Sequence, residues 1–194
     1  MTGEFQFDLC AGHLALDFAN AVSERHTGSP IEQLTDFGRL VQFFVQEQVL
    51  GPKEAKRLTA WAKAHAEAAG ALLVAARELR EALYAIFAAI ASETSPPEPA
   101  LQLFNQWLKK LCIGANLDWE WAGGDQAPEA PFAALLRAAL ALMTSVDREQ
   151  VRICNADDCA WIFLDTSKNH SRRWCDMKTC GNRMKARRFH ERHD

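Results

Sequence analysis

Several features that mark common protein classes are missing from this 194-residue sequence. It has no internal repeat, no glycine-rich loop of the kind that holds phosphate groups, and no convincing set of nucleophile, base and acid. The longest uncharged apolar stretch, Ala82 to Ser92, is too short to span a bilayer. The N-terminus carries Glu4 and Asp8 and lacks the basic start and apolar run of a secretory signal. We therefore expect a cytoplasmic protein that is not an enzyme and makes no membrane contact.

Charge is unevenly divided along the chain, because Lys and Arg are concentrated at the C-terminal end. Residues 151–194 hold ten Lys/Arg and six Asp/Glu, a net charge of +4. Residues 1–150 hold twelve Lys/Arg and nineteen Asp/Glu, a net charge of −7. This asymmetry suggests an acidic globular body joined to a basic module that could meet a polyanion. A second interpretation is that the basic groups balance nearby thiolates, because four thiolates around one zinc ion leave a net negative charge.

Four of the six cysteines fall in one segment. They form two pairs, each with four intervening residues, and fifteen residues separate the pairs: Cys154, Cys159, Cys175 and Cys180. Thiolates bind zinc tetrahedrally, so two short pairs around a hairpin-sized insert predict a closed site for one structural Zn²⁺. Four cysteines leave no position for an activated water; His170 is the alternative ligand.

The residues around these cysteines favour a treble-clef-like zinc finger. Residues 151–153 and 161–164 predict two short strands around the first pair, and a helix is expected to begin just after Cys180. Trp161 and Trp174 are interpreted as the small core of this finger. The isolated Cys10 and Cys112 are interpreted as small buried residues.

Two motifs in the chain resemble those of a known family. The run Cys180-Gly181-Asn182-Arg183, together with residues 163–169 and 172–175, closely resembles the CGNR-type zinc fingers. Residues 12–20 resemble the opening motif of the ABATE domain, which usually precedes that finger. The resemblance to the finger implies zinc binding. The family is regarded as bacterial, with a role in stress-linked transcription, which implies DNA binding.

The predicted fold is mainly α with a few short antiparallel strands (α+β). We expect a helical N-terminal domain over residues 1–147 and the zinc finger over residues 148–194. Apolar residues at helical spacing predict helices in residues 13–22, 36–50, 53–69 and 71–91 and after residues 100 and 131. Alternation predicts strands at residues 4–9 and 117–121. Thr35 is the expected helix cap, and Gly70 the expected break between two helices.

Three polar residues of the first predicted helix form a candidate pocket. Asp17 and Asn20 are three residues apart on an otherwise apolar helix, and His13 precedes them. One interpretation makes them a ligand pocket, or the site of an enzyme. The other makes them buried polar groups that tie the helix to neighbouring backbone.

The basic residues of the finger form a candidate nucleic-acid surface: Lys168, Arg172, Arg173, Arg183, Lys185, Arg187 and Arg188. In this hypothesis Arg and Lys contact phosphates, and one or two Arg reach guanine in the major groove. Alternatively the finger is a zinc-stapled platform whose cations meet an acidic protein, and Arg183 braces the metal site. One finger alone would bind DNA weakly, so a homodimer is expected if the first hypothesis holds. The effector of the N-terminal domain is unknown at this level.

Overall fold

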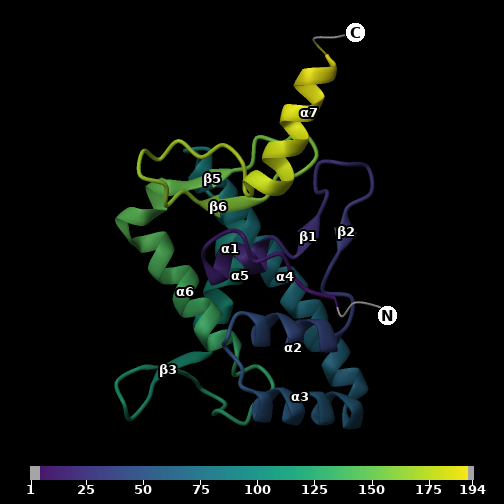
Figure 1. The fold of residues 1–194 in the computed structure, drawn as a ribbon. Coiled ribbons are helices and arrows are strands. Elements are labelled where there is room, and N and C mark those ends of the chain that lie inside the picture. The colour runs from purple at the N-terminus through teal and green to yellow at the C-terminus, as the bar shows by residue number, and fades with distance from the viewer. Residues whose placement is uncertain (1–4, 192–194) are drawn as a thin grey trace.

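The computed structural model describes residues 5–191, apart from the side chains of Arg188 and His190. Its longest element is α4 (Ala66–Ala91), which runs through the middle of the molecule (Figure 1). The predicted apolar stripe of α4 is buried, including Leu72, Ala76, Leu79 and Leu83. α4 therefore forms the axis against which the other helices pack.

Four further helices and α1 complete the helical body. α1 (Leu14–Ala19) lies against α4 and α6 (Phe132–Thr144). α2 (Phe37–Gln46) and α3 (Pro52–Ala64) pack on each other and on α4, and α5 (Glu98–Leu108) packs along α4. The centre is aromatic: the rings of Phe18 and Phe43 are 5.3 Å apart, and those of Phe44 and Phe132 are 5.2 Å apart. Burial of such rings stabilises the fold, because each ring removes a large apolar area from water.

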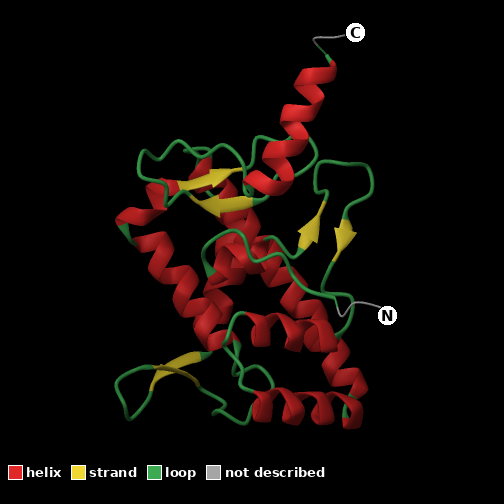
Figure 2. Cartoon of the chain, viewed as in Figure 1, coloured by secondary structure: helices red, strands yellow, loops and turns green. Residues whose placement is uncertain are grey.

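The strands of the described residues occur as three short antiparallel pairs (Figure 2). β1 (Val22–Ser23) pairs with β2 (Ile31–Glu32), and β3 (Leu111–Ile113) pairs with β4 (Trp119–Trp121). β5 (Val151–Ile153) pairs with β6 (Ile162–Leu164), with Ile153 opposite Ile162. The fold class predicted from the sequence, mainly α with a few short antiparallel strands, is confirmed.

The N-terminal segment, the cap of α2 and the length of α1 differ from the prediction. Residues 5–9 form no strand, because the backbone of Phe5 and Phe7 hydrogen-bonds to the side-chain amides of Gln42 and Gln46 on α2. The cap of α2 is Asp36 and not Thr35, since the Asp36 side chain accepts the amide of Arg39 at 3.0 Å. Helix 13–22 is shorter than predicted and ends at Ala19.

The break between α3 and α4 falls at His65 and not at Gly70. Gly70 lies inside α4, where the cost of a helical glycine, about 1 kcal/mol, is outweighed by burial of the α4 stripe. His65 leaves the helical region at φ −132° and ψ 56°, and its ring stacks on Trp61. His65 is therefore the junction between α3 and α4.

The prediction that Cys10 and Cys112 are buried is wrong. Cys112 is exposed because β3 and β4 form a two-stranded hairpin that no further layer covers, and Cys10 is half-buried. The same hairpin exposes Ile113 and Trp119, and its turn exposes Leu117.

The finger hairpin and the helical body share one hydrophobic core. Asn20 of the body exchanges two hydrogen bonds with the peptide of Ile162, at 2.7 and 2.9 Å. The Trp161 indole donates to the carbonyl of Val22, and the Tyr84 hydroxyl donates to that of Ala160, both at 2.9 Å. The predicted domain boundary between residues 147 and 148 falls within the 3-10 turn Val146–Gln150. That the chain divides there into two separately folding domains stays a prediction.

None of the helices among residues 5–191 combines the length and the apolar character that a bilayer span requires.

Candidate metal centre

Four buried cysteine sulfurs converge at the junction of the β5–β6 hairpin and the C-terminal helix. The Sγ atoms of Cys154, Cys159, Cys175 and Cys180 all lie within 4.8 Å of one another. The Cys159–Cys175 and Cys175–Cys180 sulfurs are both 3.6 Å apart. A tetrahedral zinc with Zn–S bonds of about 2.3 Å requires sulfurs about 3.8 Å apart. The sulfurs are therefore spaced as zinc ligands, without a bulky group between them.

The first pair of cysteines lies in a tight knuckle between β5 and β6. The amide of Cys154 donates to the carbonyl of Trp161 at 2.8 Å, and the amide of Cys159 donates to that of Ala156 at 3.1 Å. Ala160 takes a left-handed conformation with φ 58°, which turns the chain back into β6. These bonds bring both sulfurs to the same side of the hairpin.

The second pair is positioned by a π-helical turn (Met177–Gly181) that leads into α7 (Asn182–His190). Asp176 caps this turn, accepting the amide of Lys178 at 2.9 Å. At Gly181 a Cβ atom would lie 2.6 Å from the sulfur of Met177, so a side chain here would displace that residue. Asn182 donates its amide to the carbonyl of Lys178 at 3.1 Å. Both residues after Cys180 thus fix the local path of the chain.

Arg183 braces the metal centre. Its Nη2 donates to Cys180 Sγ at 3.3 Å and pairs with the Asp158 carboxylate at 2.8 Å. Burial, together with the charge of Cys154, raises the pKa of the Cys180 thiol. Four such groups ionise together only when a cation compensates them, which is the chemistry that a zinc ion supplies.

Comparison with protein families agrees with this geometry. The CGNR zinc finger matches residues 150–193. A second family, ABATE, described as "Putative stress-induced transcription regulator", matches residues 12–146. The chain belongs to the ABATE family and carries a CGNR zinc finger. No curated protein was found that matches the chain.

The zinc site of this ABATE–CGNR chain is structural in its chemistry. The four cysteines cluster as the zinc-binding site of the finger, and four thiolates fill a tetrahedral shell. His170 lies elsewhere, with Nδ1 3.0 Å from the carbonyl oxygen of Asp165. Neither family description names an enzymatic activity.

The basic residues of the finger fall into two groups. Arg172 donates to the carbonyls of Trp174 and Cys10, at 2.8 and 3.2 Å, and its guanidinium lies over the ring of Phe163. Arg187 pairs with Asp158 at 3.0 Å and with Asp157 at 3.6 Å. These two, with Arg183, make specific internal contacts.

The other group is exposed and makes no ion pair within residues 5–191: Lys168, Arg173 and Lys185. Lys178 is exposed on the same finger and likewise has no ion pair in this range, although the sequence did not single it out. Arg183 and Arg187 are also exposed, at 44% of their side chains, but they are paired with aspartates. Arg188 was also predicted, but its side chain lies outside the described part of the chain. DNA contact by all of these residues stays a prediction.

The acidic pair Asp157 and Asp158 was missed from the sequence. Both lie in the knuckle between the first two zinc ligands, and both face cations of α7. The sequence feature that could have identified them is the position of two adjacent aspartates directly before the zinc ligand Cys159. The partners are Arg183 and Arg187, four residues apart and therefore on one helix face.

The candidate pocket residues His13, Asp17 and Asn20 make contacts that tie α1 to its surroundings. His13 Nδ1 accepts the amide of Ala15 at 3.3 Å and so caps α1. Asp17 Oδ1 accepts the amide of Ala11 at 3.0 Å, and burial raises the pKa of Asp17 to about 6. Asn20 holds the Ile162 peptide. These contacts match the buried-polar interpretation; a ligand role for the three residues stays a prediction.

Proposed function

We propose that this protein is a cytoplasmic regulator that binds duplex DNA through the basic face of its zinc finger. In this proposal the N-terminal body senses a ligand or dimerises. The observation that carries it is the position of α7, which extends away from the body at the end of the molecule opposite α3 (Figure 1). The family description, a regulator of transcription, supports the same function.

The dimensions of α7 suit the major groove of DNA. An α-helix with its side chains is about 10–12 Å in diameter and the groove is about 12 Å wide, so the nine residues of α7 can lie in it. Met184 is buried and anchors one side of the helix to the finger, which leaves Lys185 on an exposed side. α7 contains no acidic residue that would repel phosphates.

Lys168, Arg173, Lys178 and Lys185 are the proposed phosphate contacts. All four are exposed, and within the described residues none is paired with a carboxylate. Arg183 and Arg187 are proposed as additional, weaker phosphate contacts, because DNA phosphates must compete with Asp157 and Asp158 for these two side chains. Reducing conditions in the cytoplasm keep the four zinc-binding thiols available.

The test is fluorescence anisotropy of zinc-loaded protein on labelled random duplex at several salt concentrations. We expect affinity to fall linearly with log[salt] and to vanish when a chelator removes zinc. Lys185→Gln should reduce the salt slope by about one. Lys63→Gln, an exposed lysine on α3 at the opposite end of the molecule, is the matched control and should leave the slope unchanged. Folded, zinc-loaded protein that ignores DNA at low salt would refute the proposal.

Protein binding is the second candidate function. The observation that favours it is the β3–β4 hairpin, where Ile113 and Trp119 are 54% and 44% exposed and Leu117 in the turn is 86% exposed. Exposed apolar side chains of this size are typical of contact surfaces. Sedimentation of wild-type protein and a Leu117→Ser, Trp119→Ser variant would test whether the hairpin mediates dimerisation.

A further inference from the structure

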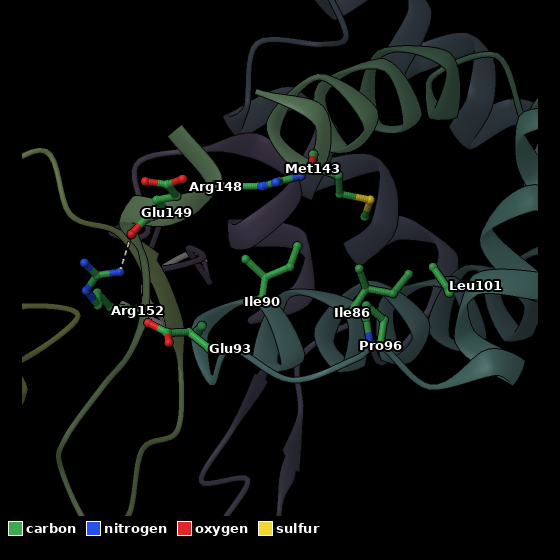
Figure 3. A pocket seen from close by; sticks show the side chains of 10 residues that line it. Ile86, Ile90, Glu93, Pro96, Leu101, Met143, Arg148, Glu149 and Arg152 are labelled. Carbon is green, nitrogen blue, oxygen red and sulfur yellow. Dashed lines mark hydrogen bonds between the residues drawn. The ribbon is translucent and has the colours of Figure 1, made fainter. Parts of the chain in front are cut away.

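A cavity of about 640 Å³ lies where the helical body meets the finger (Figure 3). Its walls come from α4, from the α4–α5 connection, from α5 and α6, and from the 3-10 turn and β5 that lead to the zinc site. This volume is within the usual range for small-molecule sites, roughly 300–1,000 Å³. Arg152 on β5 is separated from the zinc ligand Cys154 by a single residue. An occupant would therefore touch both the body and the strand that enters the metal centre.

The two ends of the cavity differ in chemistry. One end is apolar and carries Ile86, Pro96, Leu101 and Met143, with Ile90 toward the middle. The end nearest the finger carries Glu93, Glu149 and Arg152, and Arg148 extends across the opening toward Met143. The matching ligand is an amphiphile with its polar group at the finger end.

The charged groups at the finger end have bonding capacity that the protein does not use. Arg152 Nη1 donates to the backbone carbonyls of Glu149 and Val151, at 2.6 and 2.9 Å, and Arg148 Nη1 donates to the carbonyl of Met143 at 3.4 Å. Across residues 5–191, no ion pair joins Glu93, Arg148, Glu149 or Arg152 to an opposite charge. Two cations and two carboxylates therefore line the cavity with no ion-pair partner of their own, and in the described part of the chain the guanidinium groups of Arg148 and Arg152 are held only by backbone carbonyls.

This charge pattern selects a zwitterion over a simple anion or cation. A lone carboxylate would gain from Arg148 and Arg152 but would meet repulsion from Glu93 and Glu149. A lone ammonium would be attracted by Glu93 and Glu149 but repelled by Arg148 and Arg152. A ligand that carries both charges on neighbouring atoms complements all four side chains, and each charge-assisted hydrogen bond adds to specificity.

We infer that this cavity binds a small zwitterionic amphiphile, namely an α-amino acid with a long apolar side chain. Its carboxylate lies against Arg152 at the finger end, and Arg148 reaches it by leaving the carbonyl of Met143, a contact of 3.4 Å. Its ammonium faces Glu93 and Glu149, and its side chain contacts Ile86, Ile90 and Met143. This inference deepens the ligand-sensing part of the proposed function. It does not rest on the DNA-binding part, because occupancy is measured without DNA.

Three probes of equal chain length test the inference by isothermal titration calorimetry on the zinc-loaded full chain. They are 2-aminooctanoate, octanoate and octylammonium. We expect 2-aminooctanoate to bind about tenfold more tightly than either singly charged probe, because only it satisfies both pairs of charges. Equal affinity for octanoate or octylammonium would overturn the zwitterion assignment. Absence of a saturable binding heat for all three would overturn the site itself.

Two variants locate the binding. Arg148→Gln and Arg152→Gln should each weaken 2-aminooctanoate binding about tenfold. Arg148 is exposed, so its substitution is not expected to disturb folding, and thermal unfolding checks this for both variants. Lys63→Gln serves again as the matched loss of one exposed cation and should leave affinity unchanged. Wild-type affinity in both cavity variants would mean that the amino acid binds elsewhere, which would refute the inference.

Discussion

Replacing Asn20 by alanine should lower the free energy of unfolding, and the finger and the helical body should still unfold in one transition. Asn20 is 2% exposed, and its amide forms two hydrogen bonds to the Ile162 peptide across the predicted domain boundary. Alanine leaves the Ile162 N–H and C=O without these partners in a buried interface. Each buried group left unpaired costs about 1–3 kcal/mol, so loss of both bonds should lower the free energy of unfolding by roughly 2–6 kcal/mol. That is a large part of the roughly 5–15 kcal/mol typical of a domain.

Urea denaturation with two probes measures this effect. Circular dichroism follows the helices of the body, and a chromogenic zinc indicator follows opening of the four-cysteine site. Because the finger and body share one core, we expect both probes to give one coincident transition in the wild type. Asn20→Ala should shift both transitions to lower urea by the same amount.

Asn105→Ala is the matched control, since Asn105 is exposed on α5 and far from the zinc hairpin in sequence. It should change the free energy of unfolding by less than about 0.5 kcal/mol. Two results would refute the reasoning. A loss below about 1 kcal/mol in Asn20→Ala would mean that the two hydrogen bonds contribute little net free energy. Separate transitions for the two probes in the wild type would mean that the finger is an independent folding unit.

Four further predictions concern the metal, the surface and the helices. Removing zinc with a chelator should unfold the finger and expose Trp161, which a red shift of tryptophan fluorescence would report. Asp158→Asn should remove one ion pair each from Arg183 and Arg187, although Arg187 keeps Asp157, and should raise DNA affinity several-fold at low salt in the anisotropy assay. Unchanged affinity in the zinc-loaded variant would contradict the proposed competition. Burial, and then the charge of Asp17, raise the pKa of Glu47 to about 7 from its ordinary 4.5. The bound proton of Glu47 therefore stabilises the folded state fully below about pH 4.5, and this stabilisation is lost as the pH rises toward 7. In urea titrations at several pH values, Glu47→Gln should remove about 1 kcal/mol of this pH-dependent stability, a value that allows for solvent screening. Gly70→Ala should raise the unfolding free energy by about 0.5–1 kcal/mol, because a Cβ at this position inside α4 meets nothing within 4 Å.

The parts of the structure that the sequence predicted are those set by local chemistry. The four zinc ligands follow from the spacing of thiols, and the stripe of α4 follows from helical periodicity. Pro52 and Asp36 mark helix starts through their own backbone and side-chain preferences, although Thr35 competes with Asp36 for the cap in the sequence.

The parts that the sequence did not predict depend on distant partners. Residues 5–9 alternate like a strand, but Gln42 and Gln46 of α2 take the backbone hydrogen bonds that a neighbouring strand would have taken. Asn20 meets Ile162 across 142 residues of sequence, which no local pattern encodes. Gly70 remained inside a helix because the burial of α4 outweighs its local preference. The cavity beside Arg152 has lining residues from α4, the α4–α5 connection, α5, α6, the 3-10 turn and β5, so composition alone could not locate it.

Internal ion pairs limit how much charge the finger can offer to DNA. Arg183 and Arg187 are held by Asp158, and Arg172 is held by backbone carbonyls, so four cations are exposed and unpaired with carboxylates in the described residues: Lys168, Arg173, Lys178 and Lys185. Neutralising four phosphates gives a slope of about −3.6 in log K against log[salt]. A measured slope near this value would mean that one finger contacts DNA with its internal pairs intact. A slope near twice this value in wild-type protein, unchanged in Asp158→Asn, would instead mean that two chains bind together. A slope raised only in Asp158→Asn would assign the additional charge to Arg183 and Arg187.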